Sequence, residues 1–263
     1  MQLVWFRKDL RIHDNPALYH ACQQGPVTAV YFVTPKQWQA HNLSPIQADF
    51  IEANLNSLSQ SLAQLGISLI VEEVADFTKI PACLKALTER YRVDIIHANS
   101  EPEINEIQRD NAVLKSGLQL QLYQGDCILA PGSVLTKQGK MYKVFSAFRN
   151  AWMAQIKQLD LTPLAQPRAV GPAVKVTPIA INYPKISSAA FPGCESQAKR
   201  CLADFIENDI AHYGQQRDIP SLDATSHLSA YLALGVISAK VCVYQVLQAF
   251  PYALDNKASG AYI

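Results

Sequence analysis

The 263-residue sequence lacks the common short signatures of nucleotide, hydrolase and metal sites. It contains no G-x-G-x-x-G turn and no G-x-x-x-x-G-K-[ST] loop, so any nucleotide-like ligand must be bound by other means. The G-x-S-x-G elbow of many serine hydrolases is also absent. No H-x-x-x-H or cysteine-paired spacing occurs among the histidines, and we therefore predict no metal site. The six histidines are His13, His20, His41, His97, His212 and His227.

Paired cysteines, long apolar runs and an excess of charge are missing as well. Six cysteines occur without a C-x-x-C pair in a chain too large to need a disulfide framework, which predicts reduced thiols and a cytoplasmic protein. No run approaches the roughly 20 apolar residues of a membrane span, and the first residues do not form a signal peptide. A net charge of +1 excludes a histone-like polyanion binder and leaves only local basic patches.

The first 125 residues alternate short β-branched apolar runs with amphipathic stretches, which is typical of parallel βαβ units. The clearest helix begins at Ser44 as N-cap with Pro45 at its first position. The pattern predicts an α/β fold, a doubly wound Rossmann-like parallel sheet with helices on both faces. The predicted strands are 3–6, 27–32, 68–72, 94–98 and 118–123, and the predicted helices are 16–23, 44–65, 78–91 and 103–114.

Beyond this region the composition changes twice. Six prolines interrupt residues 161–193, which predicts a connector without regular structure. Helical periodicity then returns over 196–212, 225–234 and 238–250, with Ser238 as the N-cap of the last helix. We expect three parts: an α/β domain (1–125), a connector (126–195) and a helical part (196–263).

A ring-binding site is one interpretation of two loops that follow predicted strands. Trp38, His41 and Asn42 follow the second strand, and Asn105 and Glu106 follow the fourth. Because a ligand of such a sheet lies at the carboxyl ends of its strands, these side chains could meet. An amide and a carboxylate together can recognise the edge of a pterin or purine-like ring. The alternative is that Asn105 and Glu106 only cap a helix and that His41 is an ordinary loop histidine.

Two further segments carry charge or hydroxyl groups. Residues 7–14 alternate in charge directly after the first strand, and we interpret them as an ion-pair network at the edge of the sheet, with Asp14 or Asn15 capping the helix at Pro16. The segment 225–229 could bind a phosphate at a helix start, or it could be helix capping alone. Arg217 could hold a phosphate of a polymer or pair with Asp218.

Several strings in this order resemble the photolyase and cryptochrome family, and most of all its bacterial class I cyclobutane-dimer photolyases with a folate antenna. They are W-F-R-K-D-L-R at 5–11, D-N-P-A-L at 14–18, M-Y-K-V-F at 141–145, T-S-H-L-S at 225–229 and L-G-V-I-S at 234–238. The resemblance implies that the α/β domain holds an antenna chromophore and that the helical part begins an all-helical FAD-binding domain. It implies 5,10-methenyltetrahydrofolate and FAD as cofactors and damaged DNA as partner.

Site residues follow from the same resemblance. Folate contacts are expected from His41, Asn105 and Glu106, and a DNA contact from Arg217. No catalytic residue is expected within these 263 residues. Contacts to FAD are expected from Tyr213, Thr225, Ser226, His227, Leu228 and Ser229.

The implied function is light-driven repair of cyclobutane pyrimidine dimers by electron transfer from reduced FAD. The family continues beyond the point where this chain ends, so we expect a truncated chain that is inactive alone, with apolar surface exposed. A monomer without membrane association is expected. Two alternatives stay open: a cryptochrome-like blue-light photoreceptor, and a nucleotide-binding α/β module without a light function.

Overall fold

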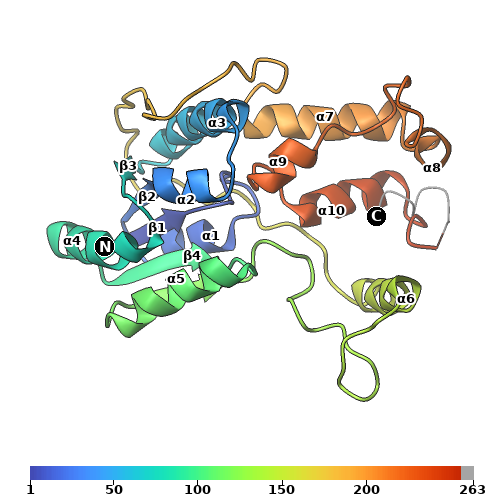
Figure 1. Ribbon diagram of the computed structural model, residues 1–263, viewed down its shortest axis with the longest axis horizontal. Helices are drawn as coiled ribbons and strands as arrows, with labels where there is room; N and C mark the ends of the chain where they lie inside the picture. The colour runs from blue at the N-terminus through green and yellow to red at the C-terminus, as the bar shows by residue number, and fades with distance from the viewer. Residues whose placement is uncertain (256–263) are drawn as a thin grey trace.

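A parallel five-stranded sheet forms the centre of the N-terminal half in the computed structural model, which describes residues 1–255. Its strand order, β3-β2-β1-β4-β5, places β1 in the middle (Figure 1). The predicted doubly wound α/β fold is confirmed, and each predicted strand boundary lies within two residues of the observed one. The strands are β1 (Gln2–Phe6), β2 (Val27–Val33), β3 (Leu69–Glu73), β4 (Ile95–Asn99) and β5 (Leu120–Tyr123).

Helices cover both faces of this sheet because successive strand residues point to opposite sides. On one face Val4 and Phe6 pack with α1 (Pro16–Gln23) and α3 (Pro45–Gln64). On the other face Leu3 and Trp5 pack with α4 (Ile80–Tyr91) and α5 (Ile104–Lys115). Short β-branched strands that are buried on both sides are the expected result of this arrangement.

Local capping chemistry sets the helix starts. The Asn15 side chain accepts a hydrogen bond from the Leu18 N–H at 3.1 Å, so Asn15 caps α1. Ser44 and Gln47 form a reciprocal capping box at the start of α3. Both predicted caps are therefore confirmed.

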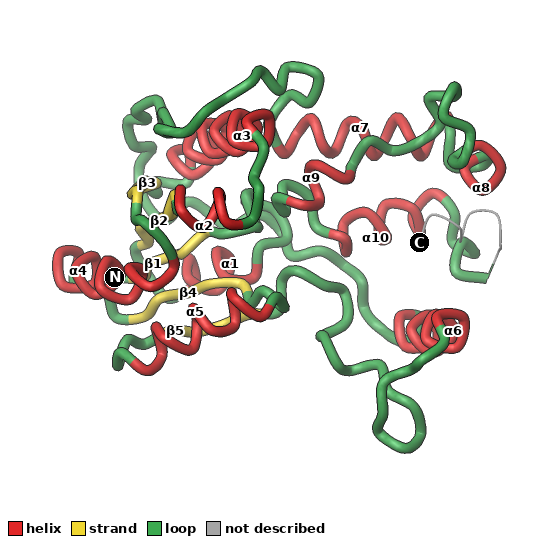
Figure 2. Tube along the Cα trace, viewed as in Figure 1, coloured by secondary structure: helices red, strands yellow, loops and turns green. Residues whose placement is uncertain are grey.

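Three helices were not predicted. The segment between the predicted strand 27–32 and the predicted helix 44–65 contains α2 (Pro35–Ala40), a helix too short for its apolar periodicity to be recognised. α6 (Phe145–Ile156) carries aromatic residues at positions 145, 148 and 152, a helical spacing that the sequence does show. The third is α8 (Tyr213–Gln216), a single turn, and Figure 2 shows the long loops that flank α6.

The proline-rich connector runs as an irregular strap along α3. Residues 157–194 contain no helix or strand, as predicted. The Val170 N–H donates to the Leu65 carbonyl at 2.9 Å, and the Ser188 hydroxyl donates to the Asp49 carboxylate at 2.8 Å. The strap leads to the helices α7 (Glu195–Asn208), α9 (Ser229–Ala233) and α10 (Ala239–Ala249).

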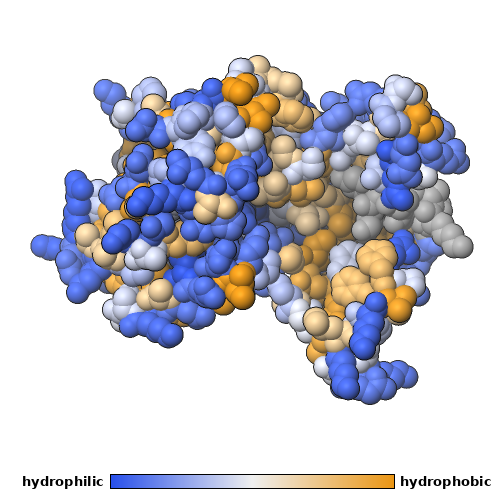
Figure 3. Space-filling view, viewed as in Figure 1, coloured by the Kyte–Doolittle hydropathy of each residue, from blue (hydrophilic) through white to orange (hydrophobic). Residues whose placement is uncertain are grey.

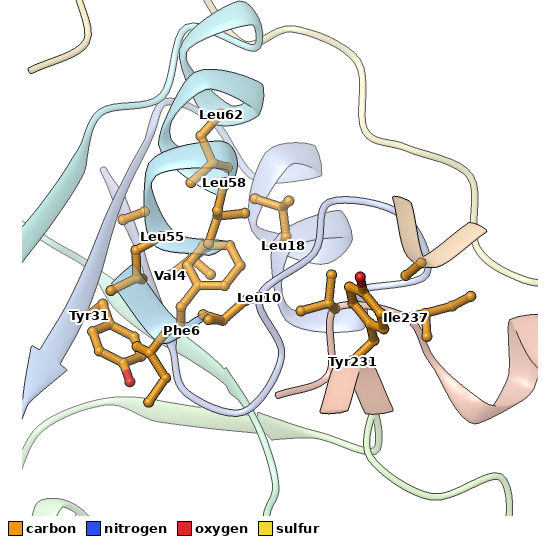
Figure 4. Close-up of a cluster of buried hydrophobic side chains, with 14 of the residues drawn as sticks. Val4, Phe6, Leu10, Leu18, Tyr31, Leu55, Leu58, Leu62, Tyr231 and Ile237 are labelled. Atoms are coloured by element: carbon orange, nitrogen blue, oxygen red, sulfur yellow. The ribbon is translucent and has the colours of Figure 1, made fainter. Parts of the chain in front are cut away.

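The helical segment shares one core with the α/β part. Leu10 and Leu18 belong to the same buried cluster as Tyr231 and Ile237 (Figure 4). By contrast, Leu135, Met141, Val144 and Phe145 are exposed on and before α6, where Figure 3 shows apolar surface. Within the described part of the chain, no helix is both long and apolar enough to cross a membrane.

Candidate functional site

The crevice between β1 and β4 is where the strand order reverses, and ligands of doubly wound sheets commonly bind at this point. Here side chains fill it. Asn99 Nδ2 donates to Asp9 Oδ2 at 2.6 Å and to Asn15 Oδ1 at 2.9 Å. A Cβ on Gly125 would lie 2.7 Å from the Asn99 side chain. The remaining space is about 10 Å³, room for roughly one water molecule, so no nucleotide fits there.

A larger pocket opens beside this crevice, over the carboxyl ends of β1 and β2. Its volume is about 260 Å³. Buried Trp38 of α2 forms part of the wall and packs edge-to-face against Tyr183, with ring centroids 5.3 Å apart. Apolar walls with a few polar groups are typical of a site for a planar organic ligand. The aromatic lining residues are Trp5, Phe6, Tyr31, Phe32, Trp38 and Phe77.

Of the three residues expected to contact folate, two line this pocket, and Asn105 lies outside the lining but beside His41. His41 and Glu106 line it, although they come from segments 65 residues apart. Asn105 Nδ2 lies 3.4 Å from His41 Nε2, and Gln37 Nε2 lies 2.8 Å from the same nitrogen. Asn42, which takes a left-handed backbone conformation, lies outside the pocket lining.

A buried ion-pair cluster forms part of the pocket wall. Arg7 Nη1 lies 2.8 Å from Asp110 Oδ1, and Arg109 Nη2 lies 2.7 Å from Glu101 Oε2. Burial raises the pKa of Glu101, and the two arginines oppose that shift. Both guanidinium groups stack on Trp5, at 4.8 and 4.7 Å from its ring centroid. The predicted ion pairs are therefore present, but they are buried at the central strand because β1 has neighbours on both sides, and the sheet-edge location was wrong.

The segment 225–229, a candidate phosphate site, differs in structure from its prediction. The helix expected to begin at Thr225 begins at Ser229 and has five residues, because 225–228 form an irregular loop. Thr225 and His227 are exposed, and His227 has a φ of 51° and pairs with Asp223. A helix dipole therefore gives little support to an anion at this segment.

The remaining candidates surround α8. Tyr213 packs edge-to-face on Phe205, with ring centroids 5.5 Å apart, and the Arg217 guanidinium lies 5.6 Å from the Tyr213 ring. Arg217 Nε also lies 3.7 Å from Asp218 Oδ2, on the surface. Among residues 1–255, no group of three metal-ligating side chains is present.

Lys8 and Leu234 are among the pocket residues that the sequence analysis did not single out. Lys8 comes from the loop after β1, and Leu234 comes from the helical segment more than 220 positions away. Lys8 belongs to a charged string for which ion pairs are the preferred interpretation. Leu234 carries no chemical signal, since only the tertiary fold brings it to the pocket.

Together, the 3-2-1-4-5 parallel sheet and the pocket at the ends of its central strands define an α/β cofactor-binding domain of the doubly wound class. The DNA photolyase family model matches residues 2–168. The chain belongs to the DNA photolyase family.

Curated relatives include the deoxyribodipyrimidine photo-lyases of Salmonella typhimurium, at 40% identity, and of Escherichia coli, at 39%. Each match covers 99% of this chain and 57% of the relative, so the chain spans little more than half the length of these proteins.

Solved structures agree with the fold. A class III photolyase from Agrobacterium tumefaciens matches with a TM-score of 0.73 and 26% identity, covering 96% of this chain and 60% of that one. A cryptochrome from Synechocystis matches with a TM-score of 0.82 and 24% identity, covering 100% of this chain and 58% of that one. The second likeness concerns the fold alone.

Proposed function

We propose that this chain belongs to a deoxyribodipyrimidine photo-lyase, an enzyme that uses light and reduced FAD to split cyclobutane pyrimidine dimers in DNA. The observation that carries the proposal is the pocket lined by His41 and Glu106, in a chain 39–40% identical to proteins of that name. The cofactor supplies the electron transfer, and the protein supplies binding and orientation.

The pocket is proposed to hold 5,10-methenyltetrahydrofolate. When bound, this pterin derivative absorbs light and passes the excitation to reduced FAD. The aromatic walls suit a planar ring, the Glu106 carboxylate can accept hydrogen bonds from ring N–H groups, and the Asn105 amide can donate as well as accept. His41 lies beside Asn105 and completes the polar edge.

FAD and damaged DNA are proposed as ligands of the helical segment. Arg217 is exposed and presents a planar fork of donors that matches a phosphate group. The proposed FAD contacts are Tyr213, Thr225, Ser226, His227, Leu228 and Ser229.

The proposed organisation is an α/β antenna domain (1–125), a connector (126–195) and the beginning of a helical FAD-binding domain (196–263). The end of β5 at Tyr123 and the start of α7 at Glu195 support these boundaries, although the connector contains α6. Residues 256–263 of the last part lie outside the described residues. We also propose that the protein is a cytoplasmic monomer.

The alternative of a nucleotide-binding module is disfavoured by the crevice between β1 and β4. The side chains of Asn99 and Asp9 fill the space that a nucleotide would need. Gly125 packs so closely against Asn99 that even a Cβ on Gly125 would clash. An assay of light-driven dimer splitting separates the cryptochrome alternative from a repair enzyme, because only the repair enzyme splits the dimer.

The test begins with titration of the purified chain with 5,10-methenyltetrahydrofolate, followed by absorbance. We expect saturable binding, and we expect Glu106→Ala to weaken it at least about tenfold, because a hydrogen bond to a charged group contributes about 1.5–3 kcal/mol. Glu89→Ala, an exposed glutamate of α4, is the matched control and should bind normally. Equal affinity of the Glu106→Ala variant would remove Glu106 from the site.

A further inference from the structure

Lys8, in the loop after β1, reaches the start of α5 with its side chain. Its Nζ is 2.7 Å from Glu103 Oε1 and 3.9 Å from Glu106 Oε1. Burial lowers the pKa of Lys8, but the hydrogen bond with Glu103 and the carboxylates of Glu101 and Glu106 outweigh it and raise the pKa on balance. A charged ammonium therefore sits among three carboxylates at the rim of the pocket.

This ammonium contributes little to the stability of the fold. The side chains of Lys8 and Glu103 are 42% and 48% exposed, and an ion pair at such a surface is worth less than about 1 kcal/mol. The Glu106 side chain is only 11% exposed and lines the pocket together with Lys8. The Lys8 ammonium therefore lies beside the nearly buried Glu106 carboxylate, at the rim of the pocket.

The backbone of Lys8 is held by the helical segment. Gly235 has a φ of +59°, and a Cβ there would lie 2.1 Å from the Lys8 carbonyl oxygen. The Leu10 N–H donates to the Leu234 carbonyl at 3.1 Å, and Arg11 Nη1 donates to the Gly235 carbonyl at 2.8 Å. Only glycine permits so close an approach in this conformation.

We propose that Lys8 is a positioning residue that orients the Glu106 carboxylate toward the pocket, and that Gly235 fixes Lys8 through its backbone. The inference rests on the proposed role of Glu106 in binding the folate. Glu101, Glu103 and Glu106 all act on the ammonium of Lys8, and like charges repel, so without the ammonium the Glu106 carboxylate turns away from the other two. The contact between Lys8 and Gly235 thereby links the helical segment to the antenna pocket.

The first experiment measures the affinity of the 263-residue chain for 5,10-methenyltetrahydrofolate. Lys8→Met removes the charge and keeps the length of the side chain, and we expect binding about fivefold weaker. Lys8→Arg restores the charge and should bind within about twofold of the unaltered chain. Lys137→Met removes an exposed cation before α6 and should change nothing.

A double-mutant cycle separates positioning from a general structural effect. If Lys8 acts through Glu106, Lys8→Met has no further effect on folate affinity in a Glu106→Gln background. The melting temperatures of the single variants should match that of the unaltered chain. Additive losses of affinity in the double variant overturn the proposal.

The link to the helical segment is tested with two glycines of similar backbone conformation. Gly235→Ala forces its Cβ against the Lys8 carbonyl and should weaken folate binding as Lys8→Met does. Gly139 has a φ of +71°, and a Cβ there would have no atom within 4 Å. Gly139→Ala therefore carries the same backbone strain without the clash and should bind folate normally.

The outcomes distinguish the two proposals. If the unaltered chain binds no folate, the antenna assignment fails and the role of Lys8 fails with it. If the chain binds folate and Glu106→Gln weakens binding while Lys8→Met does not, the antenna site stands and the positioning role is overturned. Should Gly235→Ala fail to fold, the Lys8 variants still decide the matter.

Discussion

The carboxylate of Asp14 accepts a hydrogen bond from the Ser238 hydroxyl at 2.5 Å, across 224 positions of sequence. Its other oxygen accepts from the Leu164 N–H at 2.9 Å and lies 3.1 Å from Lys240 Nζ. Ser238 is also the N-cap of α10, where its oxygen accepts from the Val241 N–H. One buried carboxylate therefore joins the loop after β1 to the connector and to the helical segment.

Replacing this carboxylate should loosen both junctions. Asp14→Asn keeps the shape of the side chain, but its NH₂ group then faces one of the donors, the Ser238 hydroxyl or the Leu164 N–H. It also leaves Lys240 without its charge partner. We expect a loss of about 2–3 kcal/mol in the free energy of unfolding, measured by urea denaturation. Asp204→Asn, on the exposed face of α7, should change it by less than about 0.5 kcal/mol. Equal denaturation midpoints for both variants would contradict this role of Asp14.

The sheet and its helices were predictable because their signals are local. Ser44, Pro45 and Asn15 act within one turn of the helices they start, and the apolar strands are contiguous in sequence. The helix expected from Thr225 was misplaced for the opposite reason. Serine and threonine are good caps in general, but here Leu228 is buried among residues of the sheet core and only Ser229 onward is helical.

The candidate site was predictable only in part. His41 and Glu106 follow strands, so the rule for carboxyl ends of parallel strands brought them together. The rule does not say which part of that edge stays open: the side chain of Asn99 fills the crevice between β1 and β4, and the pocket lies beside it. Lys8 also follows a strand, whereas Leu234 reaches the pocket through long-range packing, which no short pattern records.

His97 is buried in a polar contact between β1, β4 and β5. One ring nitrogen, Nε2, lies 2.9 Å from Gln2 Oε1, and Nδ1 lies 2.9 Å from the Tyr123 hydroxyl. Because an amide oxygen only accepts, Nε2 carries the proton and Nδ1 accepts from Tyr123. Burial and the charge of His20 lower the pKa of His97 to about 4.

This shift predicts acid sensitivity. In the unfolded state His97 binds its proton near pH 6.5, and in the folded state only near pH 4. The contribution of neutral His97 to the free energy of unfolding is therefore complete above about pH 6.5. It falls as the pH drops toward 4, by at most about 3 kcal/mol. Unfolding free energies measured between pH 7 and 4.5 should show this slope. His97→Gln should flatten it, whereas the exposed His212→Gln should retain it. A slope that survives in His97→Gln would assign the effect to other groups.

FAD should bind this chain weakly. Thr225 and His227 are exposed, and the helix after them has five residues, so the segment offers contacts to a phosphate without enclosing a flavin ring. Purified chain passed through gel filtration in excess FAD should retain well under one flavin per chain, measured by absorbance. Stoichiometric yellow protein after the column would show that the described residues suffice for a flavin pocket.

Arg217 is expected to contact a DNA phosphate, and the structure supplies an alternative that can be tested against it. Its pairing with Asp218 at 3.7 Å is exposed to solvent, with side chains 44% and 85% exposed, so the pair adds little stability. Its stacking on Tyr213 has a close counterpart in Arg90, which lies 5.2 Å from the Tyr91 ring on α4. Arg90→Ala is therefore a matched control that removes an exposed, stacked guanidinium elsewhere on the surface.

If Arg217 binds a phosphate, Arg217→Ala should weaken dimer-containing and undamaged duplexes alike, because phosphate contacts position a protein without reading sequence. The dependence of log affinity on log salt should lose about one unit of slope, since one fewer counterion is released. Arg90→Ala should leave the salt slope unchanged. Both variants should have the same melting temperature as the unaltered chain. Binding titrations at several salt concentrations decide the matter. A lower melting temperature with an unchanged slope would make Arg217 a structural partner of Asp218 and remove it from the DNA surface.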